Sequence, residues 1–245
     1  MTGPGLSVVI PAFNEAHRLP ATLARVREHL RGQDRPHEIL VVDDGSSDGT
    51  ADVARSAGED VRVLRHVPNR GKGYAVRRGM RAATGERRLM TDADLSTPIE
   101  ELAGLEAALD RGYDVAIGSR AVAGARIEVR QPAYREALGR LFNVLVQGLL
   151  LPGLSDTQCG FKLFTARAAN VAFAPCRLDG FSFDVEVLYA ARRRGLRIAE
   201  VPVVWRNDAA TRVSLGGGGT AFADLLRIRF RAMRGAYRPG AADPT

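Results

Sequence analysis

The sequence of 245 residues has little cysteine and no long apolar run. Its two cysteines, Cys159 and Cys176, provide neither a disulfide framework nor the spacing of a metal site. The longest apolar stretch, residues 144–154, is shorter than the roughly 18 residues that a membrane-spanning helix requires. The first residues show no basic segment followed by an apolar one, so we expect no secretory signal. These absences predict a cytoplasmic protein with reduced thiols.

Lysine is also scarce. Lys72 and Lys162 are the only two, and arginine supplies the rest of a positive charge that gives a net +7. A basic protein can bind nucleic acid, anionic lipid or acidic substrates, but so strong an arginine bias can reflect genome composition. Aromatic residues beside the basic clusters are sparse, and no helix-turn-helix or zinc pattern occurs. We therefore expect no nucleic-acid partner.

Apolar patterning alternates between strands and helices over the first half of the chain. Short apolar runs predict buried strands at 6–10, 38–42, 61–66, 86–91 and 114–119. Helical periodicity predicts helices at 16–31, from about residue 50, at 72–83 and at 97–110. The last one begins with TPIE, which we interpret as a capping box with Thr97 as N-cap and Glu100 at N3. This alternation predicts an α/β fold with an open, mostly parallel sheet and helices on both faces.

The second half is less regular. Helical periodicity is strong over 138–150, a loop and strand are expected at 156–164, and a helix at 183–195. The strand expected at 197–205 contains Pro202, which suggests an edge strand or a bulge. Residues 222–234 predict a basic amphipathic helix, either packed on the core or lying in a membrane interface.

Polar side chains recur where the predicted strands end. They are Asn14 and Glu15, Asp43 and Asp44, Asp92 and Asp94, and Ser119 and Arg120. Open parallel sheets bind ligands at the carboxyl ends of their strands. We therefore expect the active site at this edge.

Asp92 and Asp94 are two residues apart just after a strand. In an extended segment they point the same way, which suits a hard divalent cation such as Mg²⁺. The alternative is a turn in which Asp94 caps a helix. The position after a buried strand, beside DDGSSDGT, favours the metal site.

Two glycine-containing loops invite comparison with phosphate-binding motifs. DDGSSDGT does not match GxGxxG, and NRGKGYA does not match GxxxxGK[ST]. The first can be an ordinary turn. In the second, Lys72 between two glycines can approach a phosphate at a helix start, or the loop can simply begin a helix.

Seven segments, in order, resemble the inverting GT-A glycosyltransferases of family 2. They are SVVIPAFNEAHRL, EILVVDDGSSDGT, NRGKGYAVRRGM, DADLSTP, AIGSR, DTQCGFKLF and FDVEVLYAARRRG. Within the family, DADLSTP, DTQCGFKLF and FDVEVL are most similar to dolichyl- or polyprenyl-phosphate β-glucosyltransferases, and less so to polyprenyl-phosphate mannose synthases. The resemblance covers about residues 6 to 230 and implies a Rossmann-like GT-A domain.

The resemblance implies a nucleotide-sugar site in which Asp44 bonds the base and Lys72 lies near the diphosphate or the base. Its residues are Pro11, Ala12, Asn14, Glu15, Asp44, Lys72, Asp92, Ala93 and Asp94, with Arg206 and Arg212 from a segment that can close over the diphosphate. The implied acceptor-phosphate site contains Ser119, Arg120 and Arg135, with Arg130 and Arg140 as alternatives to Arg135.

The resemblance also implies that Asp92 and Asp94 bind Mg²⁺ or Mn²⁺, with Asp94 the more direct ligand and catalytic in that sense. Asp184 and Glu186 occupy the place of a catalytic carboxylate, although on a helix they would not share one face. A hydroxyl acceptor needs such a base. A phosphate monoester is largely dianionic at neutral pH and needs arginines to position it instead.

We therefore expect one GT-A domain over 1–245. Its parts are a nucleotide-sugar half at about 6–118, an acceptor half at about 119–215, and a basic helix and tail at about 216–245. The implied reaction moves glucose from UDP-glucose to a polyprenyl or dolichyl phosphate. GDP-mannose as donor, a soluble hydroxyl acceptor and a non-catalytic binding module remain open. Membrane contact is expected to be peripheral, at the inner face, through 222–234 and 141–154.

Overall fold

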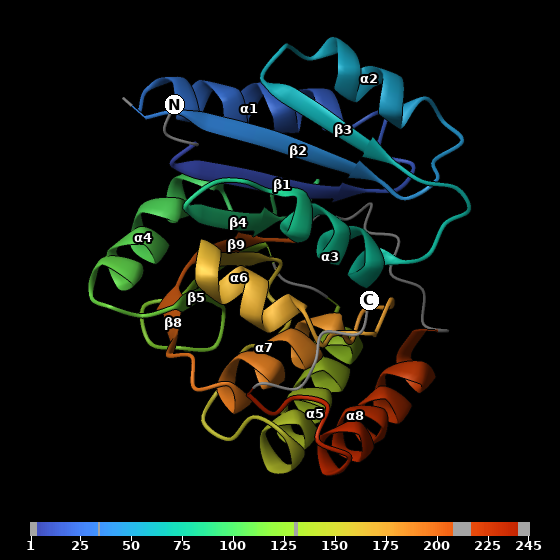
Figure 1. The fold of residues 1–245 in the computed structure, drawn as a ribbon, viewed down its shortest axis with the longest axis vertical. Helices are drawn as coiled ribbons and strands as arrows, with labels where there is room; N and C mark the ends of the chain where they lie inside the picture. Colours follow the sequence, from blue (N-terminus) through green and yellow to red (C-terminus); the bar gives the residue numbers. More distant parts are fainter. Residues whose placement is uncertain (1–3, 34, 130–131, 208–216, 240–245) are drawn as a thin grey trace.

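The computed structural model describes residues 4–33, 35–129, 132–207 and 217–239 (Figure 1). Its centre is a seven-stranded sheet in the order β3-β2-β1-β4-β7-β5-β8. The strands are β1 (Leu6–Ala12), β2 (His37–Asp43), β3 (Val61–Arg65), β4 (Arg87–Thr91), β5 (Val115–Ser119), β7 (Phe161–Thr165) and β8 (Ile198–Pro202). Every neighbouring pair is parallel except those of β7, which runs antiparallel to β4 and β5. The expected mostly parallel sheet is confirmed.

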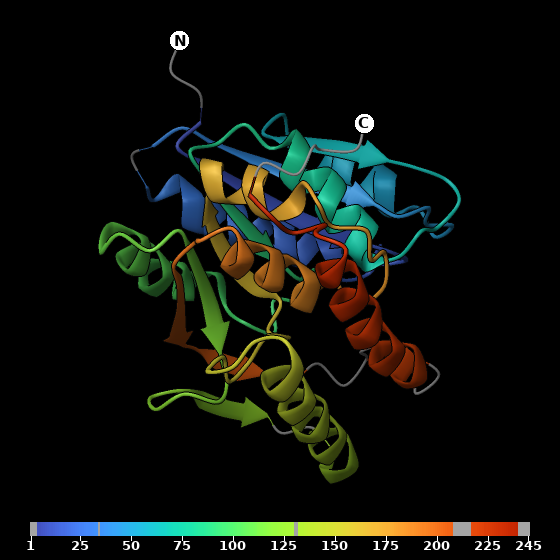
Figure 2. The ribbon, with the colours of Figure 1, turned by 60° about the horizontal axis from the view of Figure 1, so that its bottom comes forward.

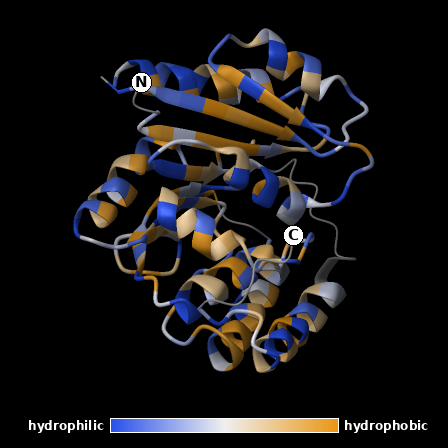
Figure 3. Ribbon diagram, in the orientation of Figure 1, coloured by the Kyte–Doolittle hydropathy of each residue, from blue (hydrophilic) through white to orange (hydrophobic). Residues whose placement is uncertain are grey.

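Helices cover both faces of this sheet, as the alternating pattern predicts. One face carries α1 (Leu19–Arg31), α2 (Thr50–Ser56), the short 3₁₀ turn η1 (Ile99–Glu101) and α4 (Leu102–Asp110). The other carries α3 (Lys72–Ala82), α6 (Ala166–Phe173) and α7 (Phe183–Arg193). Side chains alternate along a strand, so Val8 of β1 joins the first core and Val9 the second. β1 is buried along its whole length, and Figure 3 shows the hydrophobic character of the strands.

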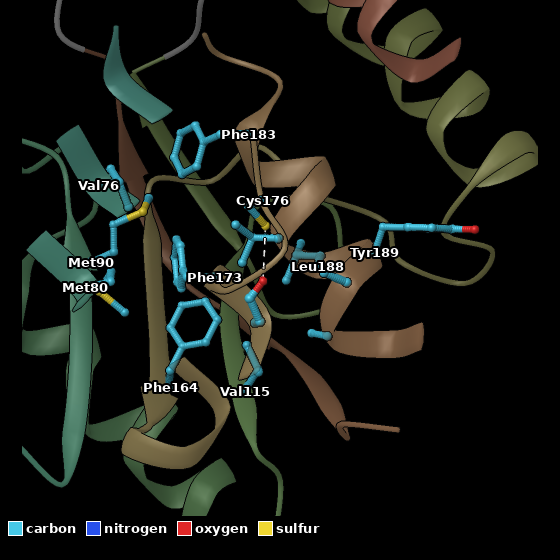
Figure 4. Close-up of a cluster of buried hydrophobic side chains, with 14 of the residues drawn as sticks. Val76, Met80, Met90, Val115, Phe164, Phe173, Cys176, Phe183, Leu188 and Tyr189 are labelled. Carbon is cyan, nitrogen blue, oxygen red and sulfur yellow. Dashed lines mark hydrogen bonds between the residues drawn. The ribbon is translucent and has the colours of Figure 1, made fainter. Parts of the chain in front are cut away.

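The core on the α3, α6 and α7 face is built from large aromatic and aliphatic side chains (Figure 4). Phe164 of β7 meets Phe173 of α6 edge-on, with ring centroids 5.4 Å apart. Cys176 is buried beside them and donates from Sγ to the Ala172 carbonyl, 3.1 Å away. Cys159 belongs to the opposite core, and both thiols are free. Neither a disulfide nor a metal explains these cysteines, which pack as small apolar side chains.

A second group of elements extends beyond the sheet. β6 (Arg126–Val129) pairs with β9 (Val204–Arg206), and α5 (Ala133–Leu149) packs against α8 (Gly217–Met233). The rings of Phe142 and Phe222 join the two helices at 5.8 Å. Figure 2 shows α5 and α8 projecting from the body on the same side. None of the helices in the described residues is long and apolar enough to span a membrane.

The structure corrects one local prediction and confirms another. Thr97 does not cap a helix: its hydroxyl lies 3.6 Å from the Cys159 thiol, and the chain enters α4 through η1 after Pro98. Burial beside Cys159 therefore takes the hydroxyl away from the helix terminus. Pro202 does end an edge strand, since β8 pairs only with β5. β6 and α6 are elements that the periodicity did not predict.

Candidate active site

The predicted site lies where β1, β2, β4 and β5 end, and one further segment joins it. Because β7 is antiparallel, its amino end meets the carboxyl ends of β4 and β5, with Phe161 opposite Thr91. Residues 156–160, which lead into β7, therefore lie at this edge. The Gly160 backbone lies directly against the Asp92 side chain, since a Cβ atom on Gly160 would stand 1.9 Å from Asp92 Oδ2.

Two lysine–aspartate pairs form the charged centre of the site. Lys72, at the start of α3, places Nζ 2.6 Å from Asp92 Oδ1. Lys162 of β7 places Nζ 2.5 Å from Asp184 Oδ1 and also donates to the Cys159 carbonyl. Lys162 and Asp184 are almost completely buried. The two lysines of the chain thus both neutralise carboxylates at one edge of the sheet.

The pKa values report how closely these charges interact. Burial raises the pKa of Asp94, and the neighbouring Asp92 charge raises it further. Burial also raises the pKa of Asp184, against the opposing effects of Lys162 and Lys72. Burial alone would lower the pKa of Lys72. The nearby carboxylates of Asp92, Asp184 and Asp94 have the larger combined effect, and the pKa is raised. The site therefore concentrates more negative charge than its lysines balance.

The carboxylate pair suits a metal that substrate helps to hold. Within the described part of the chain, no three His, Cys, Asp or Glu side chains form a cluster that could bind a metal alone. Mg²⁺ and similar ions are commonly held by one or two carboxylates plus substrate phosphates. Asp92 is paired with Lys72, whereas Asp94 accepts hydrogen bonds from Ser96, whose N–H lies 2.9 Å from Oδ1 and whose side chain also takes part. A cation beside Asp94 would offset the burial and the Asp92 charge that disfavour its ionised form. The two carboxylates fit a divalent cation such as Mg²⁺.

The two glycines around Lys72 have a packing reason. Gly71 has φ +105°, and a Cβ there would stand 2.4 Å from the Asp179 carbonyl oxygen. A Cβ on Gly73 would stand 2.5 Å from the Leu178 carbonyl oxygen, and Gly73 N–H donates to the Asp179 carbonyl at 2.8 Å. The start of α3 thus packs against the segment before α7. This contact brings Lys72 near both Asp92 and Asp184.

Asp44 has a structural role that the sequence did not indicate. Its Oδ1 accepts from Arg70 N–H at 2.7 Å and lies 2.6 Å from His66 Nε2. Its Oδ2 accepts from Gly71 N–H and from Asn69 Nδ2. The carboxylate therefore holds the whole loop that leads to Lys72. Contact between Asp44 and a nucleotide base remains a prediction.

The loop after β1 is tied to the loop after β2. Asn14, at φ +55°, donates from its N–H to Ser46 Oγ, while its side-chain oxygen accepts from Ser47 N–H. Glu15 N–H donates to Thr50 Oγ1. Three other residues expected at the nucleotide site are buried: Pro11 and Ala12 at the end of β1, and Ala93 after β4. These contacts make one rigid rim from residues that the sequence placed at two separate strand ends.

Arg120 is oriented by a buried carboxylate at the end of β5. Asp156 accepts from Arg120 Nε at 2.7 Å and Nη2 at 2.8 Å, a two-point ion pair that also keeps the pKa of Asp156 low. Glu200 in turn accepts from the N–H groups of Ser155 and Asp156. The plane of the guanidinium is thereby fixed, with its Nε and Nη2 donors directed at Asp156. Ser119 is fully buried, and its hydroxyl accepts from Ala121 N–H.

The other arginines predicted for the site lie in different places, and some lie outside the described residues. Arg206 lines a hollow beside Asp94 and α1, where its N–H donates to the Ser96 carbonyl and Nε lies 2.5 Å from Glu128 Oε2. Arg140 is exposed on α5. Arg135 lies in α5, but its side chain, like all of Arg130 and Arg212, lies outside the described residues. Only Arg206 of this group is placed next to the carboxylate pair.

Glu186, one of the two predicted catalytic carboxylates, lies outside the charged centre. It is fully buried, and Oε2 accepts from the N–H groups of Arg177 and Leu178. Oε1 accepts from Arg231 and from the Tyr237 hydroxyl. Both oxygens are occupied on the side of α7 that meets the C-terminal helix. As the helical spacing predicted, Asp184 and Glu186 do not share one face, and only Asp184 lies in the charged centre.

Gly160→Ala tests whether the position of Asp92 matters. The new Cβ must displace the carboxylate, so we expect kcat/KM of the sugar transfer that the resemblance implies to fall by about 10²-fold, the effect of a displacement of about 1 Å at a reacting centre. The matched control is Gly32→Ala, where φ is −73° and the nearest atom to the new Cβ is 3.6 Å away. Equal activities of the two variants would contradict the assignment of Asp92.

Several residues of the site were not predicted, although they lie in a segment that resembles the family. Asp156, Gly160 and Lys162 all belong to DTQCGFKLF. A lysine inside an apolar strand signals a buried cation that needs a carboxylate partner. That signal could have identified Lys162. Nothing local marks Gly160, whose importance arises from contact with a distant strand end.

Comparisons with known proteins identify the family. The model of the family described as "Glycosyl transferase family 2" matches residues 7–172. Human dolichyl-phosphate beta-glucosyltransferase is 37% identical over 250 residues, covering 95% of this chain and 77% of that protein. The yeast (Saccharomyces cerevisiae) protein of the same name is 32% identical and covers 95% of this chain and 76% of that protein.

Solved structures support the fold. Glucosyl-3-phosphoglycerate synthase from Mycobacterium tuberculosis, in complex with UDP, aligns with TM-score 0.68 and 22% identity, over 98% of this chain and 82% of that one. Mannosyl-3-phosphoglycerate synthase from Rubrobacter xylanophilus also aligns with TM-score 0.68, at 19% identity, over 98% of this chain and 77% of that one. The fold is GT-A, and the chain belongs to glycosyl transferase family 2 as a glycosyltransferase.

Proposed function

We propose that the protein transfers glucose from UDP-glucose to a dolichyl or polyprenyl phosphate, with inversion at the anomeric carbon and with Mg²⁺ or Mn²⁺. The observation that carries the proposal is the similarity to dolichyl-phosphate beta-glucosyltransferases over 95% of the chain. The site geometry agrees with it at the donor and the acceptor.

On the donor side, Asp94, with Asp92, would hold the cation against the diphosphate. When bound, the cation neutralises the charge that develops on the leaving diphosphate. Lys72 supplies a second positive charge beside Asp92, and Arg206 lines the hollow next to Asp94. The rim formed by the loops after β1 and β2 would enclose the nucleoside.

On the acceptor side, the chemistry proposed needs no general base. A phosphate monoester is already largely dianionic at neutral pH. Arg120, held in a fixed plane by Asp156, would orient its oxygens. Asp184, the remaining candidate base, is paired with Lys162 at the buried base of the site. We assign Asp184 to holding Lys162 and orienting the donor sugar.

The proposed arrangement divides one GT-A domain into a donor half at about 6–118 and an acceptor half at about 119–215, followed by the C-terminal helix. A dolichyl or polyprenyl chain is confined to a bilayer. The proposed location is therefore the cytoplasmic face of a membrane, with peripheral contact.

A transfer assay tests this function. Purified protein with Mn²⁺ or Mg²⁺ would receive radiolabelled UDP-glucose, UDP-galactose or GDP-mannose and a polyprenyl phosphate. We expect label to enter the organic phase with UDP-glucose. Transfer from GDP-mannose instead would overturn the donor assignment. Transfer only to water-soluble hydroxyl compounds would overturn the acceptor assignment and would make Asp184 a candidate base.

A further inference from the structure

Large apolar side chains that remain exposed are concentrated on α5, α8 and the short strand β6. On α8 they are Leu226, Phe230 and Met233, and on α5 they include Leu138, Leu141 and Val144. Within the part of the chain that the structure describes, α1, α2, α4 and α6 expose no such side chain. Exposed apolar patches of this kind mark interaction sites.

The outward stripe of α8 is regular. Leu226, Phe230 and Met233 follow one another at four and three residues, so they share one helix face, and they are 65%, 49% and 65% exposed. The opposite face buries Leu225 and Ile228 in the core. An ordinary surface helix has a polar outer face. α8 has apolar side chains on both sides, so its outer stripe lacks a partner within the described residues.

The charge around this stripe is positive. Arg227 and Arg229 are exposed on α8, and Arg234 follows it with its guanidinium 4.1 Å from the centre of the Phe230 ring. Asp224, the single acidic residue of the helix, is buried and paired with Arg227 at 2.8 Å. A stripe of apolar side chains bordered by arginines matches the boundary between acyl chains and anionic headgroups.

α5 lies beside α8 and also carries exposed apolar side chains. It packs against α8, and the two helices project in the same direction from the body (Figure 2). Its exposed apolar residues Leu138, Leu141 and Val144 follow at three-residue intervals. α5 comes after β5 and β6 in the chain.

We infer that the outer faces of α5 and α8 form a docking surface for a bilayer with anionic headgroups. The inference rests on the proposed function, because the acceptor would lie in the same bilayer. A second copy of the chain fits less well. Self-association through this face would bring Arg229 and Arg234 of both copies into one apolar contact.

Vesicle flotation measures the docking directly. We expect the protein to float with phosphatidylcholine vesicles that contain phosphatidylglycerol, and the triple variant Leu226→Ser, Phe230→Ser, Met233→Ser to bind at least about tenfold more weakly. Arg229→Glu should weaken binding to the anionic vesicles and have little effect with phosphatidylcholine alone. Its matched control is Arg31→Glu at the end of α1, which makes the same charge change on an exposed arginine far from this face in the chain order and fold.

Transfer assays separate this inference from the proposed function. With polyprenyl phosphate in vesicles, the triple serine variant should lose activity in proportion to its binding. With a short, water-soluble isoprenyl phosphate, it should match the original protein within about twofold, because the three substitutions lie on an exposed helix face. If no isoprenyl phosphate accepts sugar, the proposed function fails while flotation still tests the surface.

Three outcomes would overturn the docking surface. The first is an original protein that does not float with anionic vesicles. The second is a triple variant that floats equally well. The third is an original protein that elutes from gel filtration as a dimer while the triple variant elutes as a monomer. That result would assign the face to a second copy of this chain.

Discussion

Asp94→Asn is expected to reduce glycosyl transfer by about 10³-fold, the scale of losing one major electrostatic contribution to a transition state. Asparagine keeps the size of the side chain and an oxygen that can accept from Ser96 N–H. It removes the charge that would hold the cation against the donor diphosphate. Calorimetric titration with UDP and Mn²⁺ should show the loss of metal-dependent nucleotide binding.

The thermal stability of the Asp94→Asn variant should not fall with its activity. Burial and the Asp92 charge raise the pKa of Asp94 in the folded protein, so ionisation is less favourable there than in the unfolded chain. A carboxyl group with a raised folded-state pKa destabilises the fold at pH values above its unfolded-state pKa, where it must ionise. The uncharged amide avoids this cost. In the absence of metal, the thermal midpoint of the variant at neutral pH should therefore be equal or higher.

The control for this variant is Asp52→Asn on α2. Asp52 is strongly exposed, and it pairs with Arg55 at the surface. It should keep both activity and metal-dependent nucleotide binding. Retained transfer by Asp94→Asn, at the level of the Asp52→Asn control, would show that Asp94 is not the metal ligand.

Glu186→Ala is expected to lower the free energy of unfolding by about 3–5 kcal/mol, the usual cost of removing one partner from a buried ion pair. The substitution leaves the Arg231 guanidinium, the Tyr237 hydroxyl and the N–H groups of Arg177 and Leu178 without their acceptor. Denaturant titration measures the change. Transfer per folded molecule should persist, because Glu186 lies outside the charged centre.

Glu100→Ala is the matched control, since it also breaks a glutamate–arginine pair. Glu100 meets Arg25 at 2.9 Å, but both side chains are about half exposed, at 54% and 41%. Exposed pairs contribute only about 0–1 kcal/mol. Similar stability losses in the two variants would contradict the structural role of Glu186. A Glu186→Gln variant that is fully stable yet inactive would instead restore Glu186 as a catalytic candidate.

The sequence predicted that polar side chains from separate segments would meet at one edge of the sheet, because parallel strands bring their carboxyl ends together. Asp92, Lys72 and Arg120 came from separate segments, and the topology alone was enough to group them. The same periodicity separated Asp184 from Glu186, although it could not say which one faced the site. That choice depends on the core, where Arg231 and Tyr237 meet Glu186.

Contacts between segments far apart in the chain were beyond sequence reasoning. The capping box at Thr97 had the right residues, but burial beside Cys159 determined where the hydroxyl points. Asp44 had the position of a ligand-binding residue, and the loop of His66 to Gly71 occupies its carboxylate. At Thr97 a tertiary contact outweighed a local preference, as is common for caps. At Asp44 the loop contacts add a structural role, and the contact with a nucleotide base stays a prediction.

The strand order has a consequence for the synthesis of this protein. β4 and β5 follow each other in the chain but are not neighbours in the sheet, because β7, which ends at Thr165, lies between them. While the ribosome is producing residues 120–160, the native partner of both strands has not yet been made. During that interval β4 has one unpaired edge and β5 has two, because β8 has not been made either, and such edges are the kind that chaperones protect from aggregation. Pairing of β7 with β4 and β5 joins the two parts of the sheet and brings Gly160 and Lys162 to the site in the same step. Asp184 and the edge strand β8 are made later still, so the charged centre and the sheet are completed only after residue 202.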